Sequence, residues 1–225
     1  MYYFIVNPIS GCGRGKTVWK TVEQELAQLG TEYEAFLLRC KGEAKQIASS
    51  LSEIHQPFTL IAVGGDGTLN EIVSGLSTYK YVTLGCIPTG SGNDFIRMFG
   101  PDTCRFHDLE ALLDAPQESL DLIDCNGHLA LNVCSVGFDA RIGLGAADFK
   151  KLPLVSGTMA YQLSALRTIL QGIHRPYRVE LDGEVLAHKE FTLLCACNGR
   201  YYGGGFNPST TALPDDGALD FVIIK

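Results

Sequence analysis

The stretch Val63-Gly64-Gly65-Asp66-Gly67-Thr68-Leu69-Asn70-Glu71 separates an apolar run from an amphipathic one. Residues 58–63 predict a buried strand, and the residues that follow the stretch predict a helix that reaches Leu76. Three glycines beside one carboxylate allow the backbone to approach a ligand closely. A carboxylate repels a bare phosphate, so the pattern favours a nucleotide whose Mg²⁺ is held in part by Asp66. A tight strand-to-helix turn capped by the aspartate is the alternative.

Two more glycine-containing loops follow predicted strands. Residues 2–6 precede the loop Asn7-Pro8-Ile9-Ser10-Gly11-Cys12-Gly13-Arg14-Gly15-Lys16, and residues 84–87 precede Pro88-Thr89-Gly90-Ser91-Gly92-Asn93-Asp94-Phe95. The carboxyl ends of parallel strands share one edge of a sheet, and ligands bind there. Helix N-termini at that edge offer N–H groups to anions. The three loops together therefore predict a phosphate-binding site.

The first of these loops is close to a P-loop but does not match it. A P-loop has four residues between its glycines, followed by Lys and Ser or Thr, whereas Gly11 and Gly15 are separated by three residues. Arg14 and Lys16 either contact phosphate or are two solvated cations at a helix start.

The order of the predicted elements divides the chain in two. Strands and helices alternate through residues 1–118, which predicts an α/β nucleotide-binding domain with a doubly wound, mostly parallel sheet. Residues 119–225 read as short strands with one helix, from Met159 to Leu170, and predict an antiparallel, β-rich second domain. The pair Asp182-Gly183 predicts a hairpin turn.

The composition excludes some classes of function. The chain has 18 Lys and Arg against 25 Asp and Glu, without a basic cluster, which argues against a nucleic-acid partner. The eight cysteines form no CxxC and no Cys/His group with zinc spacing, so free thiols in a reducing compartment are expected. We expect no signal peptide and no transmembrane segment, hence a cytoplasmic protein that meets lipid only at a bilayer surface.

One segment combines two cations with apolar side chains. It is Phe149-Lys150-Lys151-Leu152-Pro153-Leu154-Val155. Such a loop either touches an anionic bilayer or is buried where it leads into the helix at Met159.

Taken together, the motifs resemble the diacylglycerol kinase catalytic family, which includes bacterial soluble lipid kinases, sphingosine kinases and ceramide kinases. The matching stretches are NPISG at residues 7–11, GGDGTLNE at 64–71, PTGSGNDF at 88–95, GFDA at 137–140 and LPDDGALD at 213–220. They occur in the family's order and span almost the whole chain.

The resemblance implies an ATP- and Mg²⁺-dependent kinase that phosphorylates a lipid hydroxyl, such as that of diacylglycerol, at the inner membrane surface. It implies a β-sandwich-like second domain, and a homodimer is left open. The residues that it places against ATP are Asn7, Pro8, Ile9, Ser10, Gly11, Gly64, Gly65, Asp66, Gly67, Thr68, Leu69, Asn70 and Ser91. It also implies a structural Mg²⁺ held by the Asp216 side chain and the carbonyls of Leu213 and Ala218, where the residues alone favour an ordinary turn.

Asp66 is the catalytic residue that this reading names, as a ligand of the catalytic Mg²⁺. Asn93 either orients phosphate or caps a helix, and Asp94 is either a second metal carboxylate or a helix N-cap. The family's threonine near the end of the second strand has no counterpart in residues 36–40. The family's general base is an aspartate beyond residue 225, so the chain is expected to be truncated at its C-terminus.

Two rival functions remain open. NAD kinases share the GGDGT loop but need an Asn-Glu pair well downstream of it, whereas Asn70-Glu71 follow it immediately. A nucleotide-binding regulatory protein without catalysis is the other rival, and the missing distal aspartate keeps it open.

Overall fold

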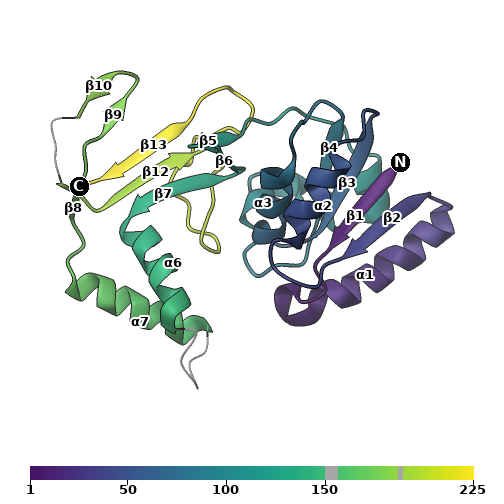
Figure 1. The fold of residues 1–225 in the computed structure, drawn as a ribbon, viewed down its shortest axis with the longest axis horizontal. Helices are drawn as coiled ribbons and strands as arrows, with labels where there is room; N and C mark the ends of the chain where they lie inside the picture. Colours follow the sequence, from purple (N-terminus) through teal and green to yellow (C-terminus); the bar gives the residue numbers. More distant parts are fainter. Residues whose placement is uncertain (150–156, 187–189) are drawn as a thin grey trace. The chain divides into compact units, whose positions relative to one another are not determined.

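The computed structural model describes residues 1–149, 157–186 and 190–225 (Figure 1). Its contacts group the chain into two compact units. The first contains Met1–Asn132 and Asn198–Ala218, and the second contains Val133–Cys197 and Leu219–Lys225. Residues 150–155, which contain the two lysines of the segment for which bilayer contact and burial both stay open, lie outside the described residues.

The first unit opens with the alternation that the sequence predicts. Its elements are β1 (Tyr2–Val6), α1 (Ser10–Leu29), β2 (Tyr33–Leu37), α2 (Glu43–Leu51), β3 (Phe58–Gly64), α3 (Asp66–Gly75) and β4 (Val82–Pro88). They are followed by α4 (Asp94–Arg97), a 3₁₀ helix (Gly100–His107), α5 (Leu109–Leu113), and the hairpin strands β5 (Ile123–Cys125) and β6 (His128–Ala130).

The four strands β1 to β4 form one parallel sheet in the order β2-β1-β3-β4. The expectation of an N-terminal parallel sheet is therefore confirmed. The chain moves from β1 outward to β2 and then crosses back to β3, so the order reverses between β1 and β3. A crevice forms at the carboxyl edge of an open sheet at such a reversal. This geometry points to the ends of β1 and β3 as the place for a ligand.

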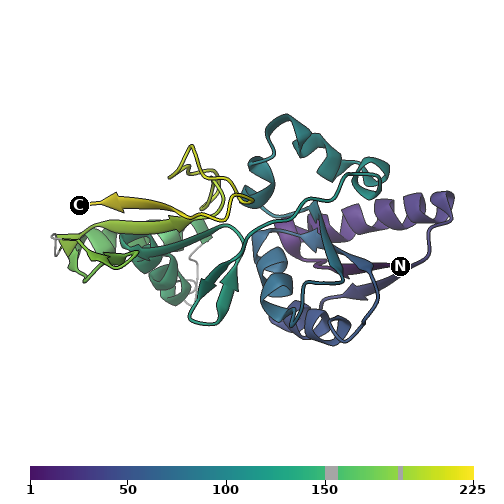
Figure 2. The same ribbon diagram turned by 90° about the horizontal axis from the view of Figure 1, so that it is seen from above.

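Alternating side chains of the central strands fill a separate core on each face of the sheet. Phe4 and Val6 pack with Trp19, Val22 and Leu26 of α1. On the opposite face, the residues that pack together include Ile5, Leu60, Ala62, Ala44, Ala48, Ile72 and Val73, from the strands and from α2 and α3. Figure 2 shows α1 on one side of the sheet and α2 and α3 on the other. The doubly wound arrangement follows from these two cores.

The first unit extends beyond Ser119, where the sequence pattern changes. The hairpin β5–β6 packs against α3, because the Ser74 hydroxyl donates to the Leu129 carbonyl at 3.0 Å and Leu131 is buried in the core. The segment Asn198–Ala218 also returns to this unit. The compact unit therefore reaches Asn132, past the expected domain limit at residue 118.

Asn198 holds the returning segment in place. Its side chain is fully buried, and its Nδ2 donates to the carbonyls of Asp121 and Leu131, both at 2.8 Å. Its backbone N–H donates to the Asn132 carbonyl at 2.9 Å. The Asn198 side chain thus joins the returning segment to the residues just before β5 and just after β6.

We expect Asn198→Ala to lower the free energy of unfolding by about 2 kcal/mol, because two buried carbonyls lose their donor. Asn70→Ala is the matched control, since the exposed Asn70 side chain makes no hydrogen bond to a described residue. Thermal unfolding followed by circular dichroism measures both. An Asn198→Ala midpoint equal to that of the control would show that the amide does not hold the segment.

The second unit is built on an antiparallel sheet of β7 (Val133–Gly137), β12 (Leu193–Cys197) and β13 (Asp220–Ile224), in the order β13-β12-β7. Two short ladders pair β8 (Arg175–Pro176) with β11 (Glu190–Phe191) and β9 (Glu180–Leu181) with β10 (Glu184–Val185). Asp182 and Gly183 both have positive φ, 50° and 85°, which suits a two-residue hairpin turn. The predicted hairpin is confirmed.

The expectation of one helix in this half is wrong, because its described residues contain two. They are α6 (Phe138–Phe149) and α7 (Gly157–Leu170). Gly143 and Gly145 interrupt the apolar periodicity of α6, which hid the helix from the sequence pattern. Gly145 is needed for packing: a Cβ there would collide with the Ser164 hydroxyl of α7. That hydroxyl donates to the Ile142 carbonyl at 2.8 Å.

Among the described residues, no helix combines the length and the apolar character needed to cross a bilayer.

Candidate nucleotide-binding site

The loops that follow β1, β3 and β4 meet at the carboxyl edge of the parallel sheet. The Asn7 Nδ2 donates to the Thr68 hydroxyl at 3.0 Å, which joins the first loop to the second. The hydroxyls of Ser10 and Thr89 hydrogen-bond to each other, which joins the first loop to the third. The Thr89 N–H donates to the Gly64 carbonyl at 2.8 Å. The three loops are therefore one hydrogen-bonded unit.

Two glycines let the second and third loops touch. A Cβ on Gly90 would lie 2.5 Å from the Gly65 Cα, and a Cβ on Gly65 would lie 2.8 Å from the Gly90 Cα. Real Cβ atoms do not approach other backbone atoms this closely. The contact between the loops therefore requires glycine at both positions.

A cavity of about 440 Å³ opens beside these loops, within the first unit. Of the thirteen residues that the family resemblance places against ATP, nine line it: Asn7, Ile9, Ser10, Gly11, Gly65, Asp66, Gly67, Thr68 and Ser91. Pro8, Gly64, Leu69 and Asn70 do not line it. Leu69 is part of the hydrophobic core, and Asn70 is exposed on α3.

One side of the cavity is formed by residues that the sequence analysis did not name as site residues. Leu38, Arg39, Cys40 and Lys41, from the loop between β2 and α2 where the family's threonine has no counterpart, contribute to its lining, together with Glu71, while Gly90 of the third loop lines it as well. The Glu71 carboxylate accepts the Gly42 N–H at 3.0 Å and so fixes this loop against α3. The available signal was topological, because β2 is parallel to β1 and ends at the same edge. Two cations thereby reach the cavity.

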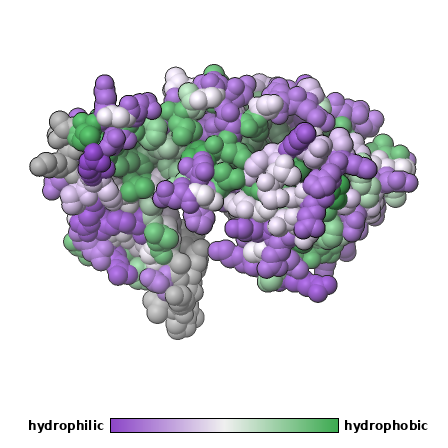
Figure 3. All heavy atoms as spheres, turned by 45° about the horizontal axis from the view of Figure 1, so that its top comes forward, coloured by the Kyte–Doolittle hydropathy of each residue, from purple (hydrophilic) through white to green (hydrophobic). Residues whose placement is uncertain are grey.

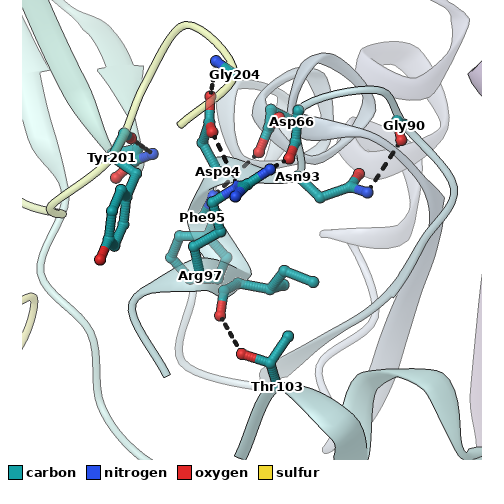
Figure 4. A network of polar contacts seen from close by, with 12 residues as sticks. Asp66, Gly90, Asn93, Asp94, Phe95, Arg97, Thr103, Tyr201 and Gly204 are labelled. Carbon is teal, nitrogen blue, oxygen red and sulfur yellow. Dashed lines mark hydrogen bonds and ion pairs between the residues drawn. The ribbon is translucent and has the colours of Figure 1, made fainter. Parts of the chain in front are cut away.

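The Asp66 carboxylate is tied to the third loop. Its Oδ1 accepts the Phe95 N–H at 3.1 Å, which fixes the start of α4 (Figure 4).

Burial, together with the negative charge of Asp66, raises the pKa of Cys86 to about 12. Cys86 is on β4, so its thiol remains protonated at neutral pH and takes no part as a nucleophile.

Asp94 does not cap a helix, so that interpretation is wrong. No side-chain cap hydrogen bond forms at the start of α4. The buried Asp94 carboxylate instead accepts the Gly204 N–H at 2.7 Å and pairs with the Arg97 guanidinium at 3.3 Å. Figure 4 shows these groups together, beside Asp66 and Asn93. Asp94 therefore anchors the returning segment to the third loop.

Asn93 is held by its own loop. Its φ of 52° lies in the left-handed region, which asparagine tolerates better than most residues. Its Nδ2 donates to the Gly90 carbonyl at 3.0 Å. Its Oδ1 is buried and makes no hydrogen bond to a described residue. These contacts favour a structural role in the loop.

Arg14 has a structural contact, since its guanidinium donates to the Pro88 carbonyl at 2.8 Å and ties α1 to the third loop. Neither Arg14 nor Lys16 lines the cavity. Gly11, Cys12 and Gly13 have positive φ, so the regular part of α1 begins after them.

A second candidate site is the turn near the end of the returning segment. The Asp216 carboxylate accepts the Ala218 N–H at 3.0 Å, and the Gly217 N–H donates to the Asp121 carboxylate at 2.7 Å. Leu213 is half-exposed. An exposed carboxylate and turn carbonyls are ligands of the kind that Mg²⁺ prefers.

Asp66, which lines the cavity, suits a metal that arrives with a nucleotide, and Asp94 lies near it outside the lining. A Cβ on Gly92 would lie 3.1 Å from an Asp66 oxygen and 3.2 Å from an Asp94 oxygen, so two carboxylates approach the same glycine. Within the described part of the chain, no group of three or more His, Cys, Asp or Glu side chains could hold a metal ion. Mg²⁺ commonly takes one or two carboxylates and completes its shell with substrate phosphates and water.

Comparison with protein families agrees with this geometry. Residues 1–125 match the family model described as Diacylglycerol kinase catalytic domain. Residues 132–225 match the model described as YegS C-terminal NAD kinase beta sandwich-like domain.

Individual relatives match over nearly the whole chain. A diacylglycerol kinase of Bacillus subtilis (strain 168) is 28% identical over 223 residues, which cover 98% of this chain and 72% of that protein. The provisionally named lipid kinase YtlR of the same strain is 27% identical over 248 residues, which cover 100% of this chain and 77% of YtlR. A crystal structure of a diacylglycerol kinase from Bacillus anthracis str. Sterne superposes with a TM-score of 0.73 at 27% identity, covering 100% of this chain and 73% of that one. The chain therefore belongs to the diacylglycerol kinase catalytic domain family.

Proposed function

We propose that this protein transfers the γ-phosphoryl group of ATP to the hydroxyl of a lipid such as diacylglycerol. The family uses ATP, and the observation that carries the proposal is the cavity at the carboxyl edge of the sheet, lined by Asn7, Ser10, Gly65, Asp66 and Ser91. In the transfer, the acceptor oxygen bonds to the γ-phosphorus as the bond to the β–γ bridging oxygen breaks, and ADP leaves.

The chain's own groups would position the phosphates. α3 begins at Asp66, next to the cavity, and the first N–H groups of a helix lack partners within it. The glycines at positions 65, 67 and 90 keep side chains away from this edge. Phosphoryl transfer depends mainly on such positioning and on charge neutralisation. The loops would therefore supply the positioning of the phosphates on which the reaction depends.

We assign Asp66, with the nucleotide's own oxygens, to the catalytic Mg²⁺. The ion would neutralise charge on the transferring phosphate. We also propose that Leu213, Asp216 and Ala218 hold a structural Mg²⁺, as the family resemblance implies.

Lys41 and Arg39 would add positive charge on the open side of the cavity. Both side chains are exposed, and exposed cations contribute modestly. We expect Lys41→Ala to raise the KM for ATP by about 5-fold, with kcat nearly unchanged, because the lost charge binds ground state and transition state alike. Lys45→Ala is the control, since Lys45 is exposed on α2 and outside the cavity lining. Equal KM values for the two variants would remove Lys41 from the site.

The rate at which Cys40 is alkylated can show whether a nucleotide occupies the cavity. It is exposed and lines the cavity, whereas Cys104 and Cys125 are exposed but do not line it. We expect Mg-ATP to slow iodoacetamide alkylation of Cys40 by roughly 10-fold or more, while Cys104 and Cys125 react at unchanged rates. Mass spectrometry of the alkylated peptides gives the three rates. Equal rates at Cys40 with and without nucleotide would place ATP elsewhere.

The identity of the molecule that accepts the phosphate distinguishes a lipid kinase from an NAD kinase and from a regulatory protein. Diacylglycerol, phosphatidylglycerol, a sphingoid base, a polyprenol and NAD can each be offered with labelled ATP. Labelled product from one of the lipids supports the proposal and names the substrate. Label in NAD instead would make the protein an NAD kinase, and nucleotide binding without any product would favour a regulatory protein.

A further inference from the structure

The surface of α7 reverses the usual pattern of a helix in a folded protein. Its buried side carries small residues, Ala160, Ser164 and Thr168, with exposed fractions of 0, 1 and 3%. Its large apolar residues point outward instead: Leu166, Ile169 and Leu170 have exposed fractions of 55, 53 and 80%. A solvent-facing helix normally presents polar residues on its outer face. The outward face of α7 is therefore suited to an apolar surrounding.

The exposed apolar residues of α7 form one stripe. Successive residues turn by about 100° around a helix. Met159, Leu166 and Leu170 therefore lie within about 40° of one another, and Ile169 lies about 60° to the side of this arc. Hydrophobic residues reach the molecular surface in several places (Figure 3), but seven of the 19 large exposed ones among the described residues lie between Leu144 and Ile173. We call the outer face formed by Met159, Leu166, Ile169 and Leu170 the α7 stripe.

The charge around the stripe is positive in a chain that is acidic. Residues 157–179 contain Arg167, Arg175 and Arg178 and no Asp or Glu. The second unit as a whole has eight Lys and Arg against seven Asp and Glu, whereas the first unit has 10 against 18. The negative charge of the protein is thus carried by the first unit.

Two arginines, Arg141 of α6 and Arg175 of β8, bind backbone carbonyls just past the C-terminal end of α7. The Arg141 guanidinium donates to the Gly172 carbonyl at 2.8 Å, and the Arg175 guanidinium donates to the Gln171 carbonyl at 3.0 Å. Among the described residues, neither pairs with a carboxylate. Arg178 differs, because it pairs with Glu180 at 2.7 Å. Carbonyl acceptors orient a guanidinium without neutralising it, so these side chains can still attract anions.

We propose that the α7 stripe docks on an anionic lipid bilayer. The apolar side chains would enter the boundary between headgroups and acyl chains, while Arg167, Arg141 and Arg175 attract the anionic headgroups. A second copy of the chain fits less well, since a two-fold contact through the stripe would bring the Arg167 side chains of both copies into one interface. The proposal rests on the proposed function in one respect, because a lipid kinase must reach a substrate that resides in a membrane.

Vesicle sedimentation tests the docking without ATP or turnover. We expect the wild-type chain to sediment with vesicles of phosphatidylcholine and phosphatidylglycerol, and at least about 10-fold less with vesicles of phosphatidylcholine alone. Leu166→Glu with Leu170→Glu should abolish sedimentation, because it places two negative charges in the α7 stripe. Both positions are exposed, so we expect the variant to fold. The matched control is Leu29→Glu with Val185→Glu, which adds the same charge at two exposed apolar positions elsewhere. The control should sediment like the wild type.

Several outcomes would overturn the docking. They are no sedimentation of the wild type, equal sedimentation of the two double variants, and a wild-type dimer in analytical ultracentrifugation that Leu166→Glu with Leu170→Glu makes monomeric. Phosphorylation of a short-chain diacylglycerol that is dispersed as monomers is measured in parallel. That reaction needs no bilayer. If the wild type does not phosphorylate the dispersed lipid, the proposed function is wrong. If it phosphorylates this lipid but does not sediment with vesicles, only the docking of the α7 stripe is wrong.

Discussion

Asp66→Asn is expected to lower kcat for lipid phosphorylation by about 10²- to 10³-fold, the usual effect of removing one group that stabilises developing charge. The amide keeps an oxygen that can accept the Phe95 N–H, so the loop contact at 3.1 Å survives. The substitution removes the negative charge of Asp66 that would hold Mg²⁺. The affinity for ATP in the absence of metal should therefore change by only a few-fold.

Asp102→Asn is the control for this change, because Asp102 is an exposed carboxylate whose one ion pair among the described residues is with the nearby Arg105, at 3.3 Å. It should leave kcat unaltered. Initial rates over a range of Mg²⁺ concentrations measure both variants. If Asp66→Asn retains kcat within a few-fold of the wild type, Asp66 is not the metal ligand that we assign.

Gly90→Ala is expected to have the second-largest effect, on nucleotide binding and stability together. The new methyl group would meet the Gly65 Cα at 2.5 Å, and that atom belongs to the backbone, which cannot turn away as a flexible side chain could. Overpacking of this kind costs about 1–3 kcal/mol or more, which corresponds to a lower melting temperature by several degrees. Separation of the two loops should also weaken ATP binding by at least about 10-fold.

Gly67→Ala provides a control within the same loop. A Cβ on Gly67 meets no atom within 4 Å, and the residue lies in α3, where alanine is favoured over glycine. Its melting temperature should equal or exceed that of the wild type. Differential scanning calorimetry and isothermal titration with ATP measure both properties, and a Gly90→Ala protein as stable as Gly67→Ala would show that the loops can separate freely.

Local patterns were enough to predict the parallel half of the fold. The apolar runs that became β1, β3 and β4 are short and each leads into a glycine-containing loop, and α1 and α2 repeat their apolar residues at helical spacing. Each of these signals lies within a few residues of the element that it specifies. The edge where the loops meet then follows from the rule for parallel sheets.

Long-range contacts could not be predicted in this way. The partner of the Asp94 carboxylate is the N–H of Gly204, 110 residues away, and no local signal marks that pair. The return of Asn198–Ala218 to the first unit depends on buried amide contacts of the same non-local kind. The α6 helix was missed because Gly143 and Gly145 interrupt its apolar periodicity, although Gly145 lies where the helix packs against Ser164 of α7. Cys40 and Lys41 became cavity residues only through the position of β2.

The central claim is tested most directly by transfer of labelled γ-phosphate from Mg-ATP to diacylglycerol in mixed micelles, assayed for this chain together with any residues encoded after Lys225. The account predicts labelled phosphatidic acid from the wild type and from Asp102→Asn, and about 10²- to 10³-fold less from Asp66→Asn. Transfer to NAD but to no lipid, or equal lipid product from the wild type and Asp66→Asn, would contradict it.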